Sequence, residues 1–431
     1  MPTTTKPAKA KSNDSAVAAA HARPGYKLTK LGWLPVEWDV VPFAKAFDRV
    51  KRELAPESGT LYREIGIRSH GKGLFYKEPK TGEQLGEKSV YWVEPDCLVF
   101  NIVFAWEQSV ARTTITDDGL IASHRFPMYR AKEDLADLDF VLYFLKTKRG
   151  KLLLEDASPG GAGRNKTLSQ GDLNKSLIPF PAYREQRRIA AILGTWDKAI
   201  ATLGALISAK QRRKQGLMQE LLSGKRRLSG RSPIADPKHP SDGWIRVELS
   251  EFVRRSTSKY DPTSNGPEIP IIELEHIESE TGRLLGRANG AETVSMKNRF
   301  VAGQVLFGKL RPYLRKFLRP DFDGACSSEI WVLDGAPRKC DNSFLHYLVQ
   351  GEHFIAACGK TSGSKMPRAD WGLVTSTPFL FPPIDEQREI GTTIRLIERE
   401  TQLLTDQLAH LTTQKRGLMQ QLLTGQIRVK A

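Results

Sequence analysis

Apolar residues recur at alternating spacings of four and three along two stretches of the chain, which is the pattern of a helix with one apolar face. The first stripe runs through Ile189, Leu193, Trp196, Ile200, Leu203, Ile207, Lys210, Lys214, Leu217 and Leu221. The second runs through Ile390, Ile394, Ile397, Thr401, Leu404, Leu408, Leu411, Lys415, Leu418 and Leu422. The spacing predicts two long amphipathic helices, over residues 181–224 and 382–425, whose stripes form the seam of a helix pair.

The two stretches are copies of one another at a constant offset of 201 residues. The matched positions include Pro181 with Pro382, Glu185-Gln186-Arg187 with Glu386-Gln387-Arg388, and Gly216-Leu217-Met218-Gln219 with Gly417-Leu418-Met419-Gln420. A proline stands before each copy, and Ser223-Gly224 or Thr424-Gly425 follows it, as expected at the two ends of a helix. The chain therefore carries an internal duplication.

Each predicted helix would expose its apolar stripe if it stood alone. Roughly 38 residues at 1.5 Å each give a length of about 57 Å. One interpretation is an ordinary core helix of a globular domain, although such helices rarely exceed 25 residues. The other is an intramolecular coiled coil, which we expect to be antiparallel because residues 225–381 must lead from the end of one helix to the start of the other. We expect Lys210, Lys214 and Lys415 to reach water from the seam along their long stems.

The segments before each helix have a mixed α/β pattern. Strand-like runs occur at 38–41, 89–93, 97–101 and 121–128, a helix is expected over 138–148, and strand-like runs return at 244–247 and 305–307. The predicted organisation is a disordered tail (1–25), a first domain (26–180), a first helix (181–224), a basic linker (225–242), a second domain (243–381), a second helix (382–425) and a C-terminal tail (426–431).

The charge balance indicates a polyanionic partner. The 431 residues carry 65 Lys and Arg against 49 Asp and Glu, a formal net charge of +16. Such an excess favours nucleic acid first and an anionic membrane second. No apolar run approaches the roughly 18 residues of a membrane span, and no signal peptide is recognisable. We therefore expect a cytoplasmic protein.

The cysteines favour neither a disulfide framework nor a standard zinc site. Cys97, Cys326, Cys340 and Cys358 form no Cys-x-x-Cys pair. His346 and His353 lie between Cys340 and Cys358, but residues 343–358 have the pattern of one amphipathic helix. We therefore expect core thiols and surface histidines here, and no metal site.

No catalytic pattern is recognisable, whereas basic residues beside turns and short strands suit DNA. The glycine-rich turn at 160–166 lacks the spacing of a phosphate-binding loop. Arg and Lys bind phosphates and guanine edges, and Asn binds adenine. The candidate DNA-contact residues are Arg63, Arg68, His70, Lys72, Arg125, Arg164, Asn165 and Lys166 in the first domain, and Lys309, Arg311, Tyr313, Lys365 and Arg368 in the second. Taken singly, each is more simply a solvated surface side chain, so the expectation rests on the collective excess of charge.

Together these features resemble the specificity subunit of type I restriction-modification systems. The resemblance rests on two dissimilar globular segments, each followed by Pro-x-x-x-Glu-Gln-Arg-x-Ile and a helix that ends Gly-Leu-Met-Gln-x-Leu-Leu-Ser/Thr-Gly. Gly32-Trp33-Leu34-Pro35, Gly243-Trp244 and residues 303–312 also fit, so the resemblance covers the chain after residue 25. The first domain departs at 96–102, which lacks the basic pair Lys309 and Arg311.

The resemblance implies two α/β target recognition domains separated by two long antiparallel coiled-coil helices, as a pseudo-twofold tandem repeat. Each domain would read one half of an asymmetric bipartite DNA site, and the chain itself would be non-catalytic. The implied partners are double-stranded DNA, two methyltransferase subunits and, where a nuclease is present, restriction/translocase subunits, with no membrane. No cofactor is implied in this chain, because the methyltransferase subunits would bind S-adenosylmethionine and the nuclease subunits ATP and Mg²⁺.

Two other classes stay open on the residues alone. One is a coiled-coil scaffold that does not bind DNA. The other is a fragment of a DNA methyltransferase.

Overall fold

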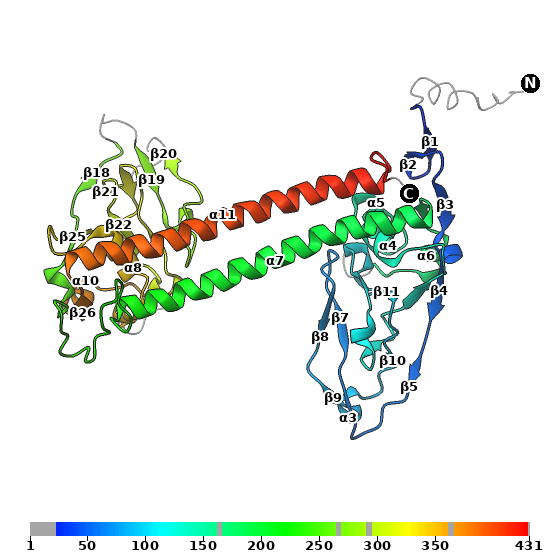
Figure 1. Ribbon diagram of the computed structural model, residues 1–431, viewed down its shortest axis with the longest axis horizontal. Helices are drawn as coiled ribbons and strands as arrows, with labels where there is room; N and C mark the ends of the chain where they lie inside the picture. The colour runs from blue at the N-terminus through cyan, green and yellow to red at the C-terminus, as the bar shows by residue number, and fades with distance from the viewer. Residues whose placement is uncertain (1–22, 162–165, 264–268, 290–294, 361–365, 430–431) are drawn as a thin grey trace, which may run out of the picture. The chain divides into compact units, whose positions relative to one another are not determined.

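The computed structural model describes residues 23–161, 166–263, 269–289, 295–360 and 366–429. The chain forms two compact units (Figure 1): unit 1 consists of residues 1–202 and 408–431, and unit 2 of residues 203–407. Each unit contains one sheet-rich domain and one part of each long helix. Of the tail predicted over 1–25, residues 1–22 lie outside the described part of the chain.

The first domain consists of short strands and helices that lead into a long helix. In order they are β1 (Tyr26–Thr29), β2 (Gly32–Pro35), β3 (Asp39–Pro42), α2 (Phe43–Ala46), β4 (Phe47–Val50), β5 (Glu53–Leu54), β6 (Leu61–Tyr62), β7 (Ile65–Ile67), β8 (Leu74–Tyr76), β9 (Lys80–Thr81), α3 (Gly82–Leu85), β10 (Val90–Trp92), β11 (Cys97–Phe100), β12 (Val110–Arg112), β13 (Ile121–Ser123), β14 (Met128–Ala131), α4 (Leu138–Leu145), α5 (Lys148–Asp156), α6 (Gln170–Lys175), β15 (Leu177–Phe180) and the long helix α7 (Tyr183–Leu222).

The second domain repeats this succession. Its elements are β16 (Ile245–Glu248), β17 (Val253–Arg255), β18 (Lys259–Tyr260), β19 (Pro270–Ile272), β20 (Ala288–Asn289), β21 (Lys297–Phe300), β22 (Val305–Gly308), β23 (Phe317–Leu318), β24 (Gly324–Cys326), β25 (Ile330–Gly335), α8 (Asn342–Leu348), α9 (Glu352–Cys358), α10 (Trp371–Thr375), β26 (Pro378–Phe381) and the long helix α11 (Ile384–Leu423).

The two domains share one four-stranded antiparallel sheet. Its order is β12-β11-β14-β4 in the first domain and β23-β22-β25-β17 in the second. In each domain the strand just before the long helix pairs with an early strand, β15 with β3 and β26 with β16. The duplication therefore extends from the helices into the frame of the domains.

The other strands differ between the domains. The first has a three-stranded sheet, β13-β10-β5, and the separate pairs β6-β9 and β7-β8. The second has a five-stranded sheet, β18-β21-β24-β19-β20, in which β19 and β24 are parallel. A common frame thus supports two different sets of strands and turns.

The long helices pair antiparallel within each unit. Each has 40 residues and lies two residues inside its predicted bounds at both ends. In unit 1 Asp197 contacts Lys415 at 2.6 Å, near the start of α7 and the end of α11. In unit 2 Lys210 contacts Glu400 at 2.7 Å, and residues further along α7 meet earlier residues of α11. The predicted mixed α/β fold with an antiparallel helix pair is confirmed.

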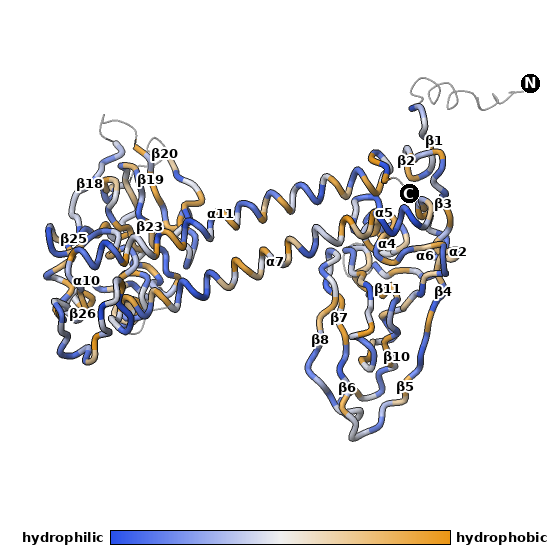
Figure 2. The backbone as a smooth tube through the Cα atoms, viewed as in Figure 1, coloured by the Kyte–Doolittle hydropathy of each residue, from blue (hydrophilic) through white to orange (hydrophobic). Residues whose placement is uncertain are grey.

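The apolar stripes of the helices enter the domain cores. Figure 2 shows apolar and polar positions alternating along α7 and α11. Of the twenty seam positions, seven are buried: Ile189, Leu193, Ile207, Leu221, Ile390, Ile394 and Leu422. Trp196, Leu203, Leu217, Ile397, Leu404 and Leu418 are among those that are partly buried. In unit 1 the stripe joins the core around Trp38, and in unit 2 the core around Trp244. Burying one large aliphatic side chain contributes about 1.5–3 kcal/mol, so each domain holds the helix ends in its own unit.

Two statements about these helices need correction. The seam lysines do not simply reach water, because Lys210, Lys214 and Lys415 each contact a carboxylate of the opposite helix.

The second correction concerns the apolar content of α7. An 18-residue window of this helix has a mean hydropathy of 1.3, so its length and composition alone would suit a membrane span. The expectation that no apolar run approaches that length is too strong. The apolar residues nevertheless lie on one stripe, as in an amphipathic helix.

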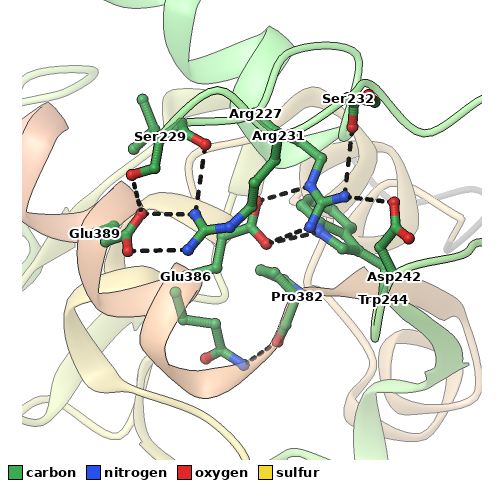
Figure 3. A network of polar contacts seen from close by, with 11 residues as sticks. Arg227, Ser229, Arg231, Ser232, Asp242, Trp244, Pro382, Glu386 and Glu389 are labelled. Carbon is green, nitrogen blue, oxygen red and sulfur yellow. Dashed lines mark hydrogen bonds and ion pairs between the residues drawn. The ribbon is translucent and has the colours of Figure 1, made fainter.

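The segment after α7 is held against the start of α11 by buried polar contacts (Figure 3). Arg227 donates from Nε and Nη2 to the two carboxylate oxygens of Glu386, at 3.0 and 2.9 Å, and from Nη1 to Asp242 at 2.9 Å. Trp244 Nε1 donates to the same Glu386 carboxylate at 3.1 Å. The segment predicted as a linker is therefore packed against α11 at Arg227.

Unit 1 contains the same contact at the matching positions. Arg428, 201 residues after Arg227, donates from Nε and Nη2 to Glu185 at 2.8 and 2.9 Å and also binds Glu37. Each long helix is thus followed by an arginine that binds the first turn of the other helix, and these two residue pairs are called the Arg–Glu clamps below.

Two local predictions are wrong. The run at 121–128 is not one strand, because a turn separates β13 from β14. Residues 343–358 do not form one helix: α8 ends at Leu348, and a second helix, α9, starts after Gly351, which is its N-cap.

Candidate nucleic-acid interface

The described candidate residues of the second domain lie on or beside one turn after the central strand β22. The turn at Pro312–Leu314 carries Tyr313, whose side chain is 56% exposed, and follows the exposed Arg311. Lys309 N–H donates to the Glu329 carbonyl at 2.9 Å, which fixes the start of this segment beside β25. We call residues 309–315 the basic turn.

The backbone of the basic turn is held in an unusual conformation. Arg311 and Arg315 both have positive φ, 51° and 48°, a region that non-glycine residues rarely adopt. Leu314 and Arg315 N–H groups donate to the carbonyls of Arg311 and Pro312, at 2.9 Å each. Arg315 also contacts Glu352 at 2.6 Å. Such conformations persist where surrounding contacts hold them, and they cluster at functional sites.

A second basic segment lies directly beside the basic turn. Arg311 N–H donates to the Pro367 carbonyl and Ala369 N–H to the Lys309 carbonyl, at 2.8 Å each. Arg368 on this segment binds Glu329 at 3.0 Å. The structure therefore brings Lys309, Arg311 and Arg368 together across nearly sixty residues of sequence, whereas Lys365 lies outside the described residues.

The candidates in the first domain lie at the hairpin formed by β7 and β8 and on two turns, one with Arg125 and one with Lys166. Arg63 lies just before β7 and stacks over the Tyr76 ring at 5.5 Å. Arg68 follows β7, stacks over Phe75 at 5.3 Å and donates to the Leu74 carbonyl at 2.7 Å. Contacts of this kind attract a charged guanidinium to the face of an aromatic ring.

The tip of the hairpin docks onto another loop. His70, with a φ of 61°, donates its N–H to the Glu107 carbonyl at 2.7 Å, and Ser69 Oγ donates to the Glu107 carboxylate at 2.9 Å. His70 and Lys72 are exposed there. The tip therefore presents polar side chains from a backbone that is fixed on one side.

A cavity of about 490 Å³ connects this hairpin with the turn that carries Arg125. Its lining includes Ser69 and Phe75 of the hairpin segment and Phe126, the neighbour of Arg125. The Arg125 carbonyl accepts from Ile102 N–H at 3.1 Å, and its side chain is exposed. The hairpin and the Arg125 turn therefore surround one hollow.

The glycine-rich turn contributes one described candidate. Lys166 stacks over the Trp106 ring at 5.5 Å, while Arg164 and Asn165 lie outside the described residues. The central strand β11 ends at Phe100 and, as its sequence indicates, has no counterpart of Lys309 and Arg311 after it. The two domains thus present different side chains from the same place in the common sheet.

The cysteines lie in the cores, where their thiols are expected to be unreactive. All four are buried. Burial raises the pKa of Cys97 to about 11 and that of Cys358 to about 12, so both thiols stay protonated near neutral pH. In the described part of the chain no group of three or more His, Cys, Asp or Glu side chains could hold a metal ion.

Sequence reasoning missed the residues that position these basic groups. Glu329 binds Arg368 and follows Ser327-Ser328, and Glu107 receives the hairpin tip. Neither belongs to a motif, and both act through contacts between distant segments. The surface histidine prediction fails for His346, because its Nδ1 is buried.

Comparisons with known proteins agree with the resemblance seen in the sequence. Residues 100–209 match the family model described as the type I restriction modification DNA specificity domain. The chain is 25% identical over 271 residues to the type I restriction enzyme EcoDI specificity subunit of Escherichia coli, an alignment that covers 55% of this chain and 58% of the relative.

Two further matches cover more of the chain. It is 23% identical over 345 residues to the type I restriction enzyme MjaVIII specificity subunit of Methanocaldococcus jannaschii, covering 77% of this chain and 80% of the relative. The chain also aligns with a solved structure, at a TM-score of 0.56 and 17% identity. That structure is described under the words "structural basis underlying complex assembly and conformational transition of the type I R-M system". That alignment covers 91% of this chain and 99% of the other, and it shows the fold.

Proposed function

We propose that this chain, which belongs to the specificity subunits of type I restriction-modification systems, reads an asymmetric bipartite site in double-stranded DNA. The observation that carries the proposal is the contrast between a common four-stranded frame and different strands and turns on it. Two domains with equal frames and different contact residues suit two different half-sites.

The basic turn is the part of the second domain that we assign to DNA. Arg311 and Tyr313 are exposed, and Lys309 and Arg368 lie on adjacent backbone segments. In the first domain we assign Arg68, His70, Lys72 and Arg125 to the same role, around the hollow described above. Arg is suited to bidentate contact with guanine, and Lys to phosphate.

Catalysis belongs to partner subunits in this proposal. The relatives are named specificity subunits, and we infer that two methyltransferase subunits bind S-adenosylmethionine and modify the DNA that this chain selects. Nuclease/translocase subunits with ATP and Mg²⁺ join where the system includes them. We infer a cytoplasmic location, where such a complex meets the chromosome.

The proposal is tested by removing charge from the basic turn. In the complex with its methyltransferase subunits, we expect Lys309→Ala to weaken binding evenly across sequences and to lower the salt slope by about 1. Arg311→Ala should cost about 1–3 kcal/mol and relax the preference at one base. The measurement is filter binding over a salt titration, combined with mapping of the methylated bases.

Lys238→Ala is the matched control, because Lys238 is an exposed lysine on the segment between α7 and β16 and belongs to neither basic segment. It should change neither affinity nor salt slope. A double Lys309/Arg311 variant that binds and selects DNA as the parent protein does would contradict this assignment of the turn.

A further inference from the structure

Each unit contains a contact of three side chains that ties its domain to both long helices. In unit 1 the Tyr143 hydroxyl, on α4, donates to Asp197 Oδ2 of α7 at 2.6 Å. Lys415 Nζ of α11 donates to Asp197 Oδ1 at 2.6 Å and lies 5.1 Å from the centre of the Tyr143 ring. One carboxylate thus joins the domain, its own helix and the opposite helix.

Unit 2 repeats the contact with the roles of the helices exchanged. The Tyr347 hydroxyl, on α8, donates to Glu398 Oε2 of α11 at 2.7 Å. Lys214 of α7 binds the other oxygen of Glu398 and lies 5.9 Å from the centre of the Tyr347 ring. We call these two sets the Tyr–acid–Lys contacts.

The two contacts are equivalent in the duplication. Glu398 follows Asp197, and Lys415 follows Lys214, by the helix offset of 201 residues. The tyrosines are 204 residues apart, so the domains have changed length while the contact has been retained. Both tyrosines are buried. A contact made twice, in domains that differ outside their common frame, indicates a role common to both.

The physical effect of the contact is to fix an angle. Apolar burial holds a domain on a helix but is non-directional, so it defines the rotation of the domain poorly. Hydrogen bonds are directional, and each contact draws its three members from three different elements. A polar group within an otherwise apolar seam also specifies register, at some cost in stability.

Burial also keeps both tyrosines in the form that the contact needs. It raises the pKa of Tyr143 and of Tyr347, an effect strengthened by the neighbouring carboxylate. Each hydroxyl therefore remains a proton donor at neutral pH.

We propose that the two Tyr–acid–Lys contacts are positioning elements that set the angle of each recognition domain about the helix pair, and hence the number of base pairs tolerated between the half-sites. The proposal rests on the proposed function. It assigns no base contact to these residues. They act on specificity through the placement of the domains.

The test is Tyr143→Phe in the full chain with its methyltransferase subunits. This variant keeps the ring and removes only the donor to Asp197. On DNA carrying the native half-sites with spacers one base pair shorter, equal or longer, we expect the preference for the native spacer to fall about tenfold, the order expected for losing a hydrogen bond to a charged group. The half-site bases should stay the same.

Several variants separate positioning from simple stability. Tyr183→Phe removes a hydroxyl at the start of α7, outside the contact, and should leave spacer preference unchanged. Asp197→Glu reproduces the acid found in unit 2 and should retain most of the preference. Tyr347→Phe tests the second contact if Tyr143→Phe fails to fold.

The outcomes are distinguishable. Lowered thermal stability with an unchanged spacer preference in both tyrosine variants would overturn the positioning role and leave the proposed function intact. Parent protein that shows no sequence preference at any spacer length would instead refute the proposed function.

Discussion

The imidazole of His346 is a group whose protonation the fold opposes. It lies on α8 between the rings of Phe317 and Tyr347, with centroid distances of 5.5 and 5.0 Å. Its Nδ1 is buried and has no hydrogen-bond partner among the described residues. Burial is the main cause that lowers the pKa of His346 to about 4; the nearby Lys214 and Arg319 act in the same direction, and Glu398 acts against them.

The pKa of His346 predicts a pH dependence of stability. Because the folded pKa lies below the unfolded value of about 6.5, the neutral ring contributes its full stability above pH 6.5, and this is lost as the pH falls towards 4. We expect His346→Phe to remove about 3 kcal/mol of the acid-induced loss in unfolding free energy over this window.

The measurement is urea unfolding at several pH values between 7 and 4. His239→Gln, at an exposed site, is the control and should follow the parent curve. Parallel curves for the parent and His346→Phe would show that the ring is protonated without cost in the folded state.

At the scale of residues, the sequence indicates which side chains are candidates better than it indicates their contacts and burial. Lys309, Arg311 and Tyr313 were recognisable because a basic, proline-containing segment follows a strand-like run. The pairing of this segment with Arg368 was not predictable, since it depends on a backbone contact between segments far apart in the chain. The burial of His346 depends in the same way on Phe317, which lies on another element.

At the scale of elements, the Arg–Glu clamps hold each helix start against the segment that follows the other helix. Their exposure differs, because the Arg227 side chain is 3% exposed and the Arg428 side chain 40%. Removing one partner of a buried pair leaves the other charge uncompensated, which costs about 3–5 kcal/mol. In the other clamp Glu185 is 4% exposed but Arg428 is open to water, so solvent screening lowers the contribution of that pair.

We therefore expect Arg227→Met to destabilise the start of α11 by about 3 kcal/mol, and Arg428→Met to destabilise the start of α7 by clearly less. Hydrogen exchange of residues 384–390 and 183–189 measures the two effects separately. If the two substitutions accelerated hydrogen exchange equally in the two segments, or in neither segment, this prediction would be refuted.

The elements that were predicted well are those with a long, regular pattern. Forty residues of heptad spacing leave little freedom, so both helices appear within two residues of their expected bounds. Short elements are decided by single turns. The first helical run ends at Leu348, and Gly351 caps the start of the next, which a periodic pattern over 343–358 does not reveal.

At the scale of the whole molecule, we propose that helix length sets the distance between half-sites. Inserting one heptad between Thr202 and Leu203 and one between Gln407 and Leu408 keeps both seams in register, because seven residues restore the same face. The insertion adds about 10.5 Å at 1.5 Å per residue, or about three base pairs at 3.4 Å each.

We expect the preferred spacer to lengthen by about three base pairs on this arithmetic, with lower efficiency because the second half-site is rotated around the duplex. Mapping of methylated sites provides the measurement, and a four-residue insertion at each position, which breaks the seam, serves as the control. An unchanged spacer, or altered half-site bases, would argue against helix length as the determinant.

The sequence did not reveal how the units are composed. A linear division assigns each helix to the domain before it, whereas the compact units divide both helices between them. The physical reason is the antiparallel pairing, which places the end of α11 in the core of the first unit through Leu422 and Leu423.

This composition has a consequence for synthesis of the protein. The first unit lacks residues 408–431 until all of unit 2, residues 203–407, has been translated. At about 5–20 residues per second, that delay is on the order of 10–40 seconds. During this time Leu422 is missing from the core that it shares with Ile189 and Leu193. The nascent first domain therefore leaves the ribosome with an uncovered apolar stripe, which residues 408–431 later cover.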